Sequence, residues 1–244
     1  MDMDEIIRIK NLKKSFGNNK ILKSISLTLE KGQNMAILGK SGSGKTVLIK
    51  SIIGLIPVDS GSIMVYDKNI PELNNDELEE IRKKVGYLFQ GGALYDSMSV
   101  RENLEFPVRR TQLSKNKHEL NDMVEEALSY VDLLDSIDKM PSELSGGMKK
   151  RVGLARTLIL KPEIILYDEP TTGLDPVTSG EISELILQVQ ETYNTSSIII
   201  THDMKCVRMT ANHIKLLSKG IFKAEGSFED LAESNDDEVR AFFT

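Results

Sequence analysis

The chain has 244 residues, of which 40% are hydrophobic and 28% are charged, a length and balance typical of one α/β domain or of a core with a second lobe. Its net charge of -6 and pI near 5.3 disfavour a protein that binds nucleic acid by neutralising phosphates. The one cysteine, Cys206, excludes an internal disulfide and a four-cysteine zinc site, and we expect it to pack in the core.

The sequence contains no segment with the character of a membrane span. No uninterrupted apolar run approaches the roughly 18 residues needed to cross a bilayer. The first residues, Met1-Asp2-Met3-Asp4-Glu5, are acidic where a signal peptide is basic. We therefore expect a cytosolic protein that takes part in any membrane process through a partner.

Residues 6–29 alternate apolar and polar side chains, as Ile7 and Leu27 illustrate. This period of two predicts two strands with one buried face, joined by a turn over residues 16–19. Phe16 lies at the mouth of that turn. Its ring is placed either to stack on an adenine ring or to pack in the core, and the sequence does not decide between the two.

Residues 39–46 fit the pattern of a glycine, four free positions and Gly-Lys-Ser/Thr, which is the phosphate-binding P-loop. An apolar run at residues 35–38 precedes the loop and a helical pattern follows it, as the motif requires. Lys45 is expected to reach the outer phosphates, and the Thr46 hydroxyl to bind the bridging Mg²⁺. A glycine-rich turn is the alternative. The residues predicted to bind the nucleotide here are Gly39, Lys40, Ser41, Gly42, Ser43, Gly44, Lys45 and Thr46.

Two further strands are predicted at residues 62–65 and 84–89, and the second of them ends at Gln90. Open α/β sheets place ligands at the carboxyl ends of their strands, so Gln90 is a candidate to contact the metal and an attacking water. A glutamine that merely caps the strand is the alternative.

Between residues 91 and 160 the pattern changes to a helical one, which predicts a mostly helical lobe inserted in the sheet domain. One serine and two glycines, residues 145–147, precede the last helix of this lobe. Such a helix start forms either a second anion site of the same physical kind as the P-loop or a plain serine cap.

An apolar strand at residues 163–167 runs straight into Asp168 and Glu169. This is the Walker B pattern expected beside a P-loop. Asp168 is predicted to hold Mg²⁺, and Glu169 to orient or deprotonate the water that attacks the γ-phosphate. Buried carboxylates are costly unless they meet a cation, whereas the alternative is two exposed turn acids.

The last third of the chain repeats the layout of an apolar strand with polar residues at its tip. Asp175 has the residue type expected at the start of a helix. A strand over residues 197–200 leads to His202, which is predicted to donate to the γ-phosphate or to position water, with a purely structural histidine as the alternative. A final strand at residues 214–217 is expected to complete the sheet.

The order of these motifs resembles the ATP-binding subunit of ABC transporters over nearly the whole chain. The Ser-Gly-Gly signature between the P-loop and Walker B is highly specific to that family. The resemblance implies an ATPase with Mg²⁺ as cofactor and an α/β P-loop NTPase (RecA-like) fold. It also implies a core with an antiparallel β subdomain at about residues 1–90 and 161–244, and an inserted α-helical subdomain at about residues 91–160.

The resemblance further implies that two copies pair head to tail, so that Ser145 and Gly147 of one copy close over ATP held by Lys45 of the other. It implies that the surface over residues 91–107 drives a membrane permease, which holds the chain on the cytoplasmic face of the inner membrane. The residues carried over are Phe16, Ser145, Gly147 and Asp175 for the nucleotide, Glu169, His202 and Gln90 for catalysis, and Thr46, Gln90 and Asp168 for the metal.

Within the family, the chain looks like the Mla-type ATPase of bacterial lipid-asymmetry systems. Met148 stands where the family usually has Gln, Phe16 stands where Tyr is common, and residues 89–96 and 104–107 fit the Mla type. This implies phospholipid transport with a permease and an MCE-domain lipid carrier. Other cargo, such as amino acids or lipoproteins, is the alternative. A non-transport ABC protein of DNA repair or translation is disfavoured, because the chain has one P-loop and no heptad run.

Overall fold

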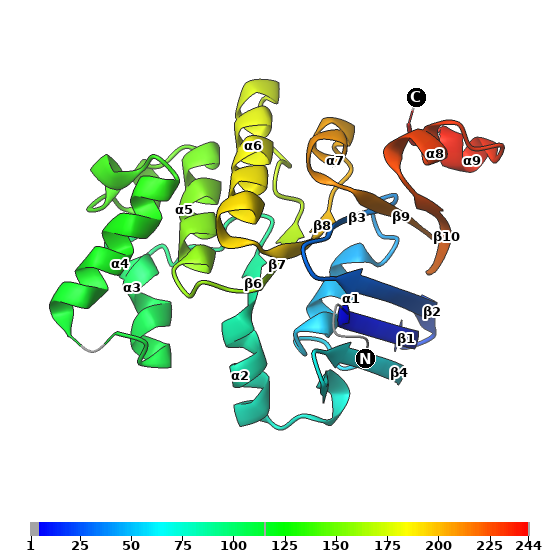
Figure 1. The fold of residues 1–244 in the computed structure, drawn as a ribbon, viewed down its shortest axis with the longest axis horizontal. Coiled ribbons are helices and arrows are strands. Elements are labelled where there is room, and N and C mark those ends of the chain that lie inside the picture. Colours follow the sequence, from blue (N-terminus) through cyan, green and yellow to red (C-terminus); the bar gives the residue numbers. More distant parts are fainter. Residues whose placement is uncertain (1–4, 115, 244) are drawn as a thin grey trace.

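Two sheets organise the chain in the computed structural model, which describes residues 5–114 and 116–243 (Figure 1). The acidic start at residues 1–4 therefore lies outside the described residues. The smaller sheet is antiparallel, and it has the order β2-β1-β4-β5. Its strands are β1 (Glu5–Phe16), β2 (Asn19–Glu30), β4 (Ser60–Val65) and β5 (Lys68–Asn69). The predicted alternation is confirmed, because Ile7 and Leu27 belong to the buried core.

The larger sheet has the order β10-β9-β3-β8-β7-β6, and all neighbours except the pair β10 and β9 run parallel. Every residue of β3, β7 and β8 is buried, which explains why each strand contains an uninterrupted apolar run of three or four residues. The carboxyl ends of the parallel strands meet at one edge. The strands are β3 (Asn34–Leu38), β6 (Val85–Leu88), β7 (Ile164–Asp168), β8 (Ser196–Ile200), β9 (His213–Ser218) and β10 (Ile221–Gly226).

Helices cover both sides of this sheet, and three of them gather at one end of the molecule (Figure 1). These three, α3 (Val100–Thr111), α4 (Lys117–Tyr130) and α5 (Gly146–Leu158), lie between β6 and β7 in the chain. They share a buried apolar cluster with α6 (Pro176–Tyr193). A helical region is thus inserted in the sheet domain, while the domain limits near residues 90 and 160 stay predictions. The remaining helices are α1 (Lys45–Ile52), α2 (Asn75–Lys84), α7 (Met204–Thr210), α8 (Phe228–Ala232) and α9 (Asp237–Arg240), with short 3-10 turns at Ile70–Glu72, Leu134–Ser136 and Pro141–Glu143.

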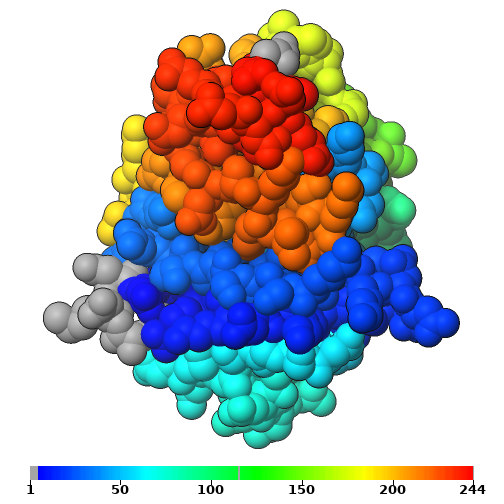
Figure 2. Space-filling view, turned by 90° about the vertical axis from the view of Figure 1, so that its right-hand side faces the viewer, coloured from blue at the N-terminus to red at the C-terminus, as the bar shows by residue number. Residues whose placement is uncertain are grey.

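The C-terminal elements pack on the edge of the larger sheet. Figure 2 shows β9, β10 and the final helices stacked above β1 and β2. Phe228 meets Phe243 edge to face, and both rings pack against a third apolar cluster that contains Leu216. No helix in the described ranges combines the length and apolar character needed to cross a bilayer.

Candidate nucleotide site

The P-loop connects the carboxyl end of β3 to the start of α1. Gly42 and Gly44 have φ values of 76° and 105°, a region that residues with a Cβ rarely adopt. A Cβ on Gly44 would also lie 2.9 Å from side-chain carbons of Ile21 and Leu22. The first N–H groups of an α-helix have no acceptor within the helix, so the loop and the helix start together form an anion site.

Lys45 is the cation of this loop. Its side chain is 7% exposed, and its Nζ donates to the carbonyls of Gly39 at 2.7 Å and Lys40 at 3.4 Å. Nζ also lies 3.8 Å from Oε1 of Glu169. Burial lowers the pKa of Lys45, while the charges of Glu169 and Asp168 raise it. The ammonium is thus desolvated and aimed at the place where acidic groups converge.

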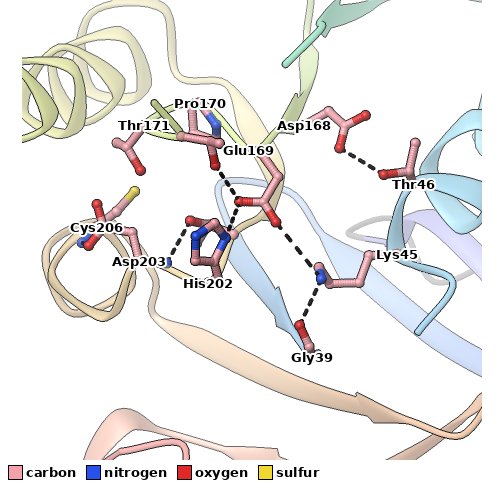
Figure 3. A network of polar contacts seen from close by, with 12 residues as sticks. Gly39, Lys45, Thr46, Asp168, Glu169, Pro170, Thr171, His202, Asp203 and Cys206 are labelled. Atoms are coloured by element: carbon pink, nitrogen blue, oxygen red, sulfur yellow. Dashed lines mark hydrogen bonds and ion pairs between the residues drawn. The ribbon is translucent and has the colours of Figure 1, made fainter. Parts of the chain in front are cut away.

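Asp168 ends β7 beside the P-loop (Figure 3). One carboxylate oxygen accepts from the Thr46 hydroxyl at 3.1 Å, and the other accepts from the Tyr87 hydroxyl at 2.9 Å. Burial, with the charge of Asp168 as a second cause, raises the pKa of Tyr87 and keeps the phenol protonated as a donor. The structure thus brings Thr46 and Asp168, both predicted metal ligands, into contact.

Glu169 follows with a backbone φ of 52°, a conformation that costs about 1–3 kcal/mol in a residue other than glycine. Its side chain is 12% exposed, and Oε2 accepts from the Thr172 hydroxyl at 2.9 Å. The same oxygen lies 2.8 Å from Nδ1 of His202 (Figure 3). The alternative of two exposed turn acids is wrong, because both carboxylates are largely withdrawn from water and partnered.

The second predicted anion site lies elsewhere on the surface. Ser145 is exposed, and its hydroxyl accepts from the N–H of Met148 at 3.2 Å, so the serine cap of α5 is confirmed. Gly147 is buried, and a Cβ there would lie 2.6 Å from the side chain of Thr178. Among the described residues no hydrogen bond joins Ser145 to Lys45 or Glu169. Its role toward an anion stays a prediction.

Three other predicted residues have different outcomes. Phe16 is 52% exposed at the end of β1, so the core alternative is wrong, and Nζ of Lys14 lies 5.1 Å from its ring centre. Asp175 caps α6 by accepting from the N–H groups of Val177 and Thr178, which confirms the reason given for its type. Gln90 is exposed beyond β6, and in the described part of the chain its side chain makes no hydrogen bond to the acidic cluster. Its predicted contact with a metal stays a prediction.

The chemistry of the P-loop fits a nucleoside triphosphate. Oγ of Ser43 is buried and has no hydrogen-bond partner among the described residues, which leaves a donor for a phosphate oxygen inside the loop. A hydroxyl and a carboxylate, from Thr46 and Asp168, are hard oxygen ligands of the kind that Mg²⁺ takes together with phosphate oxygens. The described residues contain no cluster of three or more acidic, histidine or cysteine side chains that would hold a metal by itself.

Three contributors were not predicted from the sequence. Tyr87 and Thr172 bond the two acidic side chains, and Lys150 donates from α5 to the backbone around Glu169. The one available signal for Tyr87 is its place on the strand that ends at Gln90. Lys150 carries a weaker signal, because it is one of three consecutive basic residues at positions 149–151 and the sequence does not reveal which of them is buried.

The sequence and the fold are both similar to those of known proteins. The family model described as ABC transporter matches residues 22–172. The chain is 40% identical over 238 residues to the intermembrane phospholipid transport system ATP-binding protein MlaF of Haemophilus influenzae, covering 97% of this chain and 89% of that protein. It is 40% identical over 242 residues to the probable ribonucleotide transport ATP-binding protein mkl of Mycobacterium leprae, covering 99% of this chain and 70% of that protein.

A solved structure confirms the fold class. A dimeric ATP-binding cassette in a post-hydrolysis state, bound to ADP and Pi, superimposes with a TM-score of 0.83 at 30% identity. The match covers 91% of this chain and 98% of that chain. The α/β P-loop architecture predicted from the sequence is therefore correct.

Proposed function

The chain belongs to the ABC transporter family of ATP-binding proteins, and from this membership we propose that it hydrolyses ATP to power a transporter whose membrane-spanning part is a separate permease. The observation that carries the proposal is the setting of Glu169. One oxygen of its carboxylate faces His202 and Thr172, and the other faces Lys45. A base is thereby held next to the cation that would bind the outer phosphates.

The side chains of the site are assigned the following tasks. The P-loop N–H groups and Lys45 bind the phosphates of ATP and offset their charge. Thr46 and Asp168 would hold Mg²⁺, which supplies further charge neutralisation, and Gln90 is assigned to the same ion. Glu169 takes the proton of the attacking water while the bond between the γ-phosphorus and the leaving ADP oxygen breaks, giving ADP and phosphate. His202 keeps the Glu169 carboxylate in place and donates toward the γ-phosphate.

A second copy is proposed to complete each site. Ser145 lies on the surface at the start of α5, where it is free to meet the ATP bound by another chain, and the solved relative is a dimer. Gly147 is assigned a backbone role there. Phe16 is assigned to the nucleotide of its own chain, and Asp175 to the nucleotide at the closed interface. ATP held between two chains turns binding into closure, and hydrolysis removes the link.

The permease is proposed to contact residues 91–107, which would hold the ATPase on the cytoplasmic face of the inner membrane. Ala93 and Tyr95 are exposed in this segment, whereas Leu94 is half-buried. The ring of Tyr95 packs on that of Phe106, which gives the exposed aromatic surface a firm support.

The cargo is proposed to be phospholipid, delivered with an MCE-domain lipid carrier. The supports are the likeness to MlaF across 89% of its length and the Met148 variant of the signature. The alternative is another cargo, since a relative of equal identity carries the word ribonucleotide in its name. Purification with the permease followed by lipid analysis separates the two: bound phospholipid supports the first, and a lipid-free complex whose ATPase responds to a soluble solute supports the second.

The assignment of Glu169 has a direct test. Glu169→Gln keeps the shape but loses the base, so we expect turnover to fall by about 10²- to 10⁴-fold while ATP affinity is retained. Steady-state hydrolysis and equilibrium binding of a fluorescent ATP analogue measure the two quantities. Glu163→Gln, at the exposed start of the same segment, is the matched control and should leave turnover unchanged. Turnover near wild type in Glu169→Gln would remove the proposed base.

A further inference from the structure

Lys150 is a buried lysine on the second turn of α5, and all its donors point at one segment of backbone. It is 5% exposed, and its Nζ donates to the carbonyl oxygens of Glu169 at 3.1 Å, Pro170 at 2.8 Å and Thr172 at 2.7 Å. An ammonium has three N–H groups, so each one has an acceptor. The segment that it grips begins with the residue assigned as the base.

Burying Lys150 lowers the stability of the fold, which suggests that its hydrogen bonds to residues 169–172 serve a function. Burying an ammonium costs free energy even when its hydrogen bonds are all made, and an apolar side chain of the same length would fill the space at less cost. The gripped segment also contains a strained residue, because Glu169 has φ 52°. A donor on the carbonyl of that residue opposes its relaxation to a commoner conformation, which would turn the carboxylate away from Lys45.

We propose that Lys150 is a positioning residue that holds Glu169 in its reactive orientation and connects it to α5, the helix that Ser145 caps. Lys150 lies on α5, and Ser145 caps the start of the same helix five positions earlier. A displacement of the Ser145 end is therefore transmitted to the backbone of Glu169. The inference rests on the proposed function, and it adds a connection between the two half-sites of one chain.

The protonation state of Lys150 gives this connection a signature. Burial lowers the pKa of Lys150 to about 8, while the charge of Glu169 opposes the shift. Glu169 is the charged group that faces Nζ from the gripped segment. Arg151, next on α5, instead bonds Val131 and Glu181, and Asp175 at the start of α6 bonds Thr178. Above this pH the neutral amine has two N–H groups for three carbonyls, so the hold on Glu169 weakens.

The experiment compares Lys150→Met and Lys150→Arg with wild type, using the full chain assembled with its permease. In the described part of the chain, the hydrogen bonds of Lys150 go to the backbone of residues 169–172 and none goes to residues 39–46. Lys150→Met is therefore expected to lower kcat by about tenfold to a hundredfold with KM for ATP within about twofold. Amide hydrogen exchange over residues 169–172 should be faster in this variant. Lys83→Met, which removes a partly exposed lysine paired with Glu80 on α2, is the control and should match wild type.

Lys150→Arg keeps a permanent positive charge, so it should recover most of kcat. Its activity should also persist at alkaline pH, where the wild-type kcat declines above about pH 8. If Lys150→Met is too unstable to assay, this pH comparison decides. Wild-type kcat in Lys150→Met, or identical alkaline profiles for wild type and Lys150→Arg, overturns the inference. If Glu169→Gln is inactive and Lys150→Met is fully active, this inference alone is wrong. If Glu169→Gln is active, the proposed function is wrong.

Discussion

Asp168 and Glu169 are neighbours in the chain but have separate surroundings. Asp168 accepts from the hydroxyls of Thr46 and Tyr87, and Glu169 faces His202 and Lys45. The positive φ of Glu169 sends the second side chain in a different direction from the first. The two neighbouring carboxylates are therefore far enough apart in their surroundings for the separate roles proposed for them, Asp168 as a metal ligand and Glu169 as a base.

Phe16 gives the prediction at this scale. Its ring is exposed on one side and has Lys14 near it, an ammonium held in turn by Asp59 at 3.3 Å. If the ring stacks on adenine, Phe16→Ala should weaken ATP binding by about tenfold, since such stacking contributes roughly 1–3 kcal/mol. Phe16→Tyr keeps the ring and should bind as wild type. Equilibrium binding is measured with ATP and with inorganic triphosphate, which has no base. A loss of stacking lowers the affinity of Phe16→Ala for ATP but not its affinity for triphosphate. Equal affinity of Phe16→Ala and wild type for ATP would refute the stacking role.

The sequence predicted the site residues whose positions follow from local pattern. Lys45 and Thr46 are placed by the loop that contains them, and Asp168 and Glu169 by the strand that precedes them. Lys150 was not predictable in this way, because its acceptors lie some 20 positions along the chain and depend on how α5 packs. The ambiguity at Phe16 had the same origin, since exposure is a property of the assembled fold.

At the scale of elements, the strands were easier to predict than the helices. β3, β7 and β8 are buried on both faces, so their apolar runs stand out. α2 was not predicted because only two of its ten residues, Leu78 and Ile81, are apolar and buried, and two apolar positions in a highly charged segment do not stand out as a core-facing helix. Its start is marked instead by a capping box between Asn74 and Glu77.

The cap of α6 gives a prediction on stability. Hydrogen bonds, first from the Thr178 hydroxyl and then from its backbone N–H, hold the pKa of Asp175 below its usual value. A carboxyl with a lowered folded-state pKa stabilises the fold above its unfolded-state pKa, and this contribution is lost as the pH falls through the lower value. Asp175→Ala should therefore lower Tm at neutral pH, and the difference from wild type should shrink below about pH 4. Thermal unfolding between pH 3 and 8 measures it, with Asp67→Ala in the β4–β5 turn as control. A constant difference across this range would contradict the charged cap.

At the scale of the whole molecule, the two candidate anion sites of one chain are not joined by hydrogen bonds between Ser145 and the Lys45 cluster within the described ranges. This separation is what a shared site between two symmetric copies requires, because each copy then gives a different half to each site. In the proposed arrangement, one chain alone holds two incomplete halves. The surface position of Ser145 and the buried position of Lys45 agree with their unequal tasks.

A mixing experiment tests this arrangement. Lys45→Ala removes the ammonium that binds the phosphates, and Ser145→Arg blocks the half-site at the start of α5. A dimer made of either variant alone should be inactive. A mixed dimer has one site with both defects and one with none, so random mixing should restore about a quarter of the wild-type rate if the sites act independently. The ATPase rate of separately purified and then mixed chains is the measurement, and a mixture of either variant with itself is the control. No recovery on mixing would place the whole site within one chain.

The P-loop is fastened by its own lysine. Nζ of Lys45 donates to the carbonyl of Gly39, six residues earlier, so the loop is closed on itself. A loop tied in this way loses little freedom when it captures an anion, and most of the attraction between them remains available as affinity. The lysine exchanges one oxygen partner for another, and no segment has to fold first. We therefore expect the rate of ATP binding to be limited by the frequency of encounters between ATP and the protein.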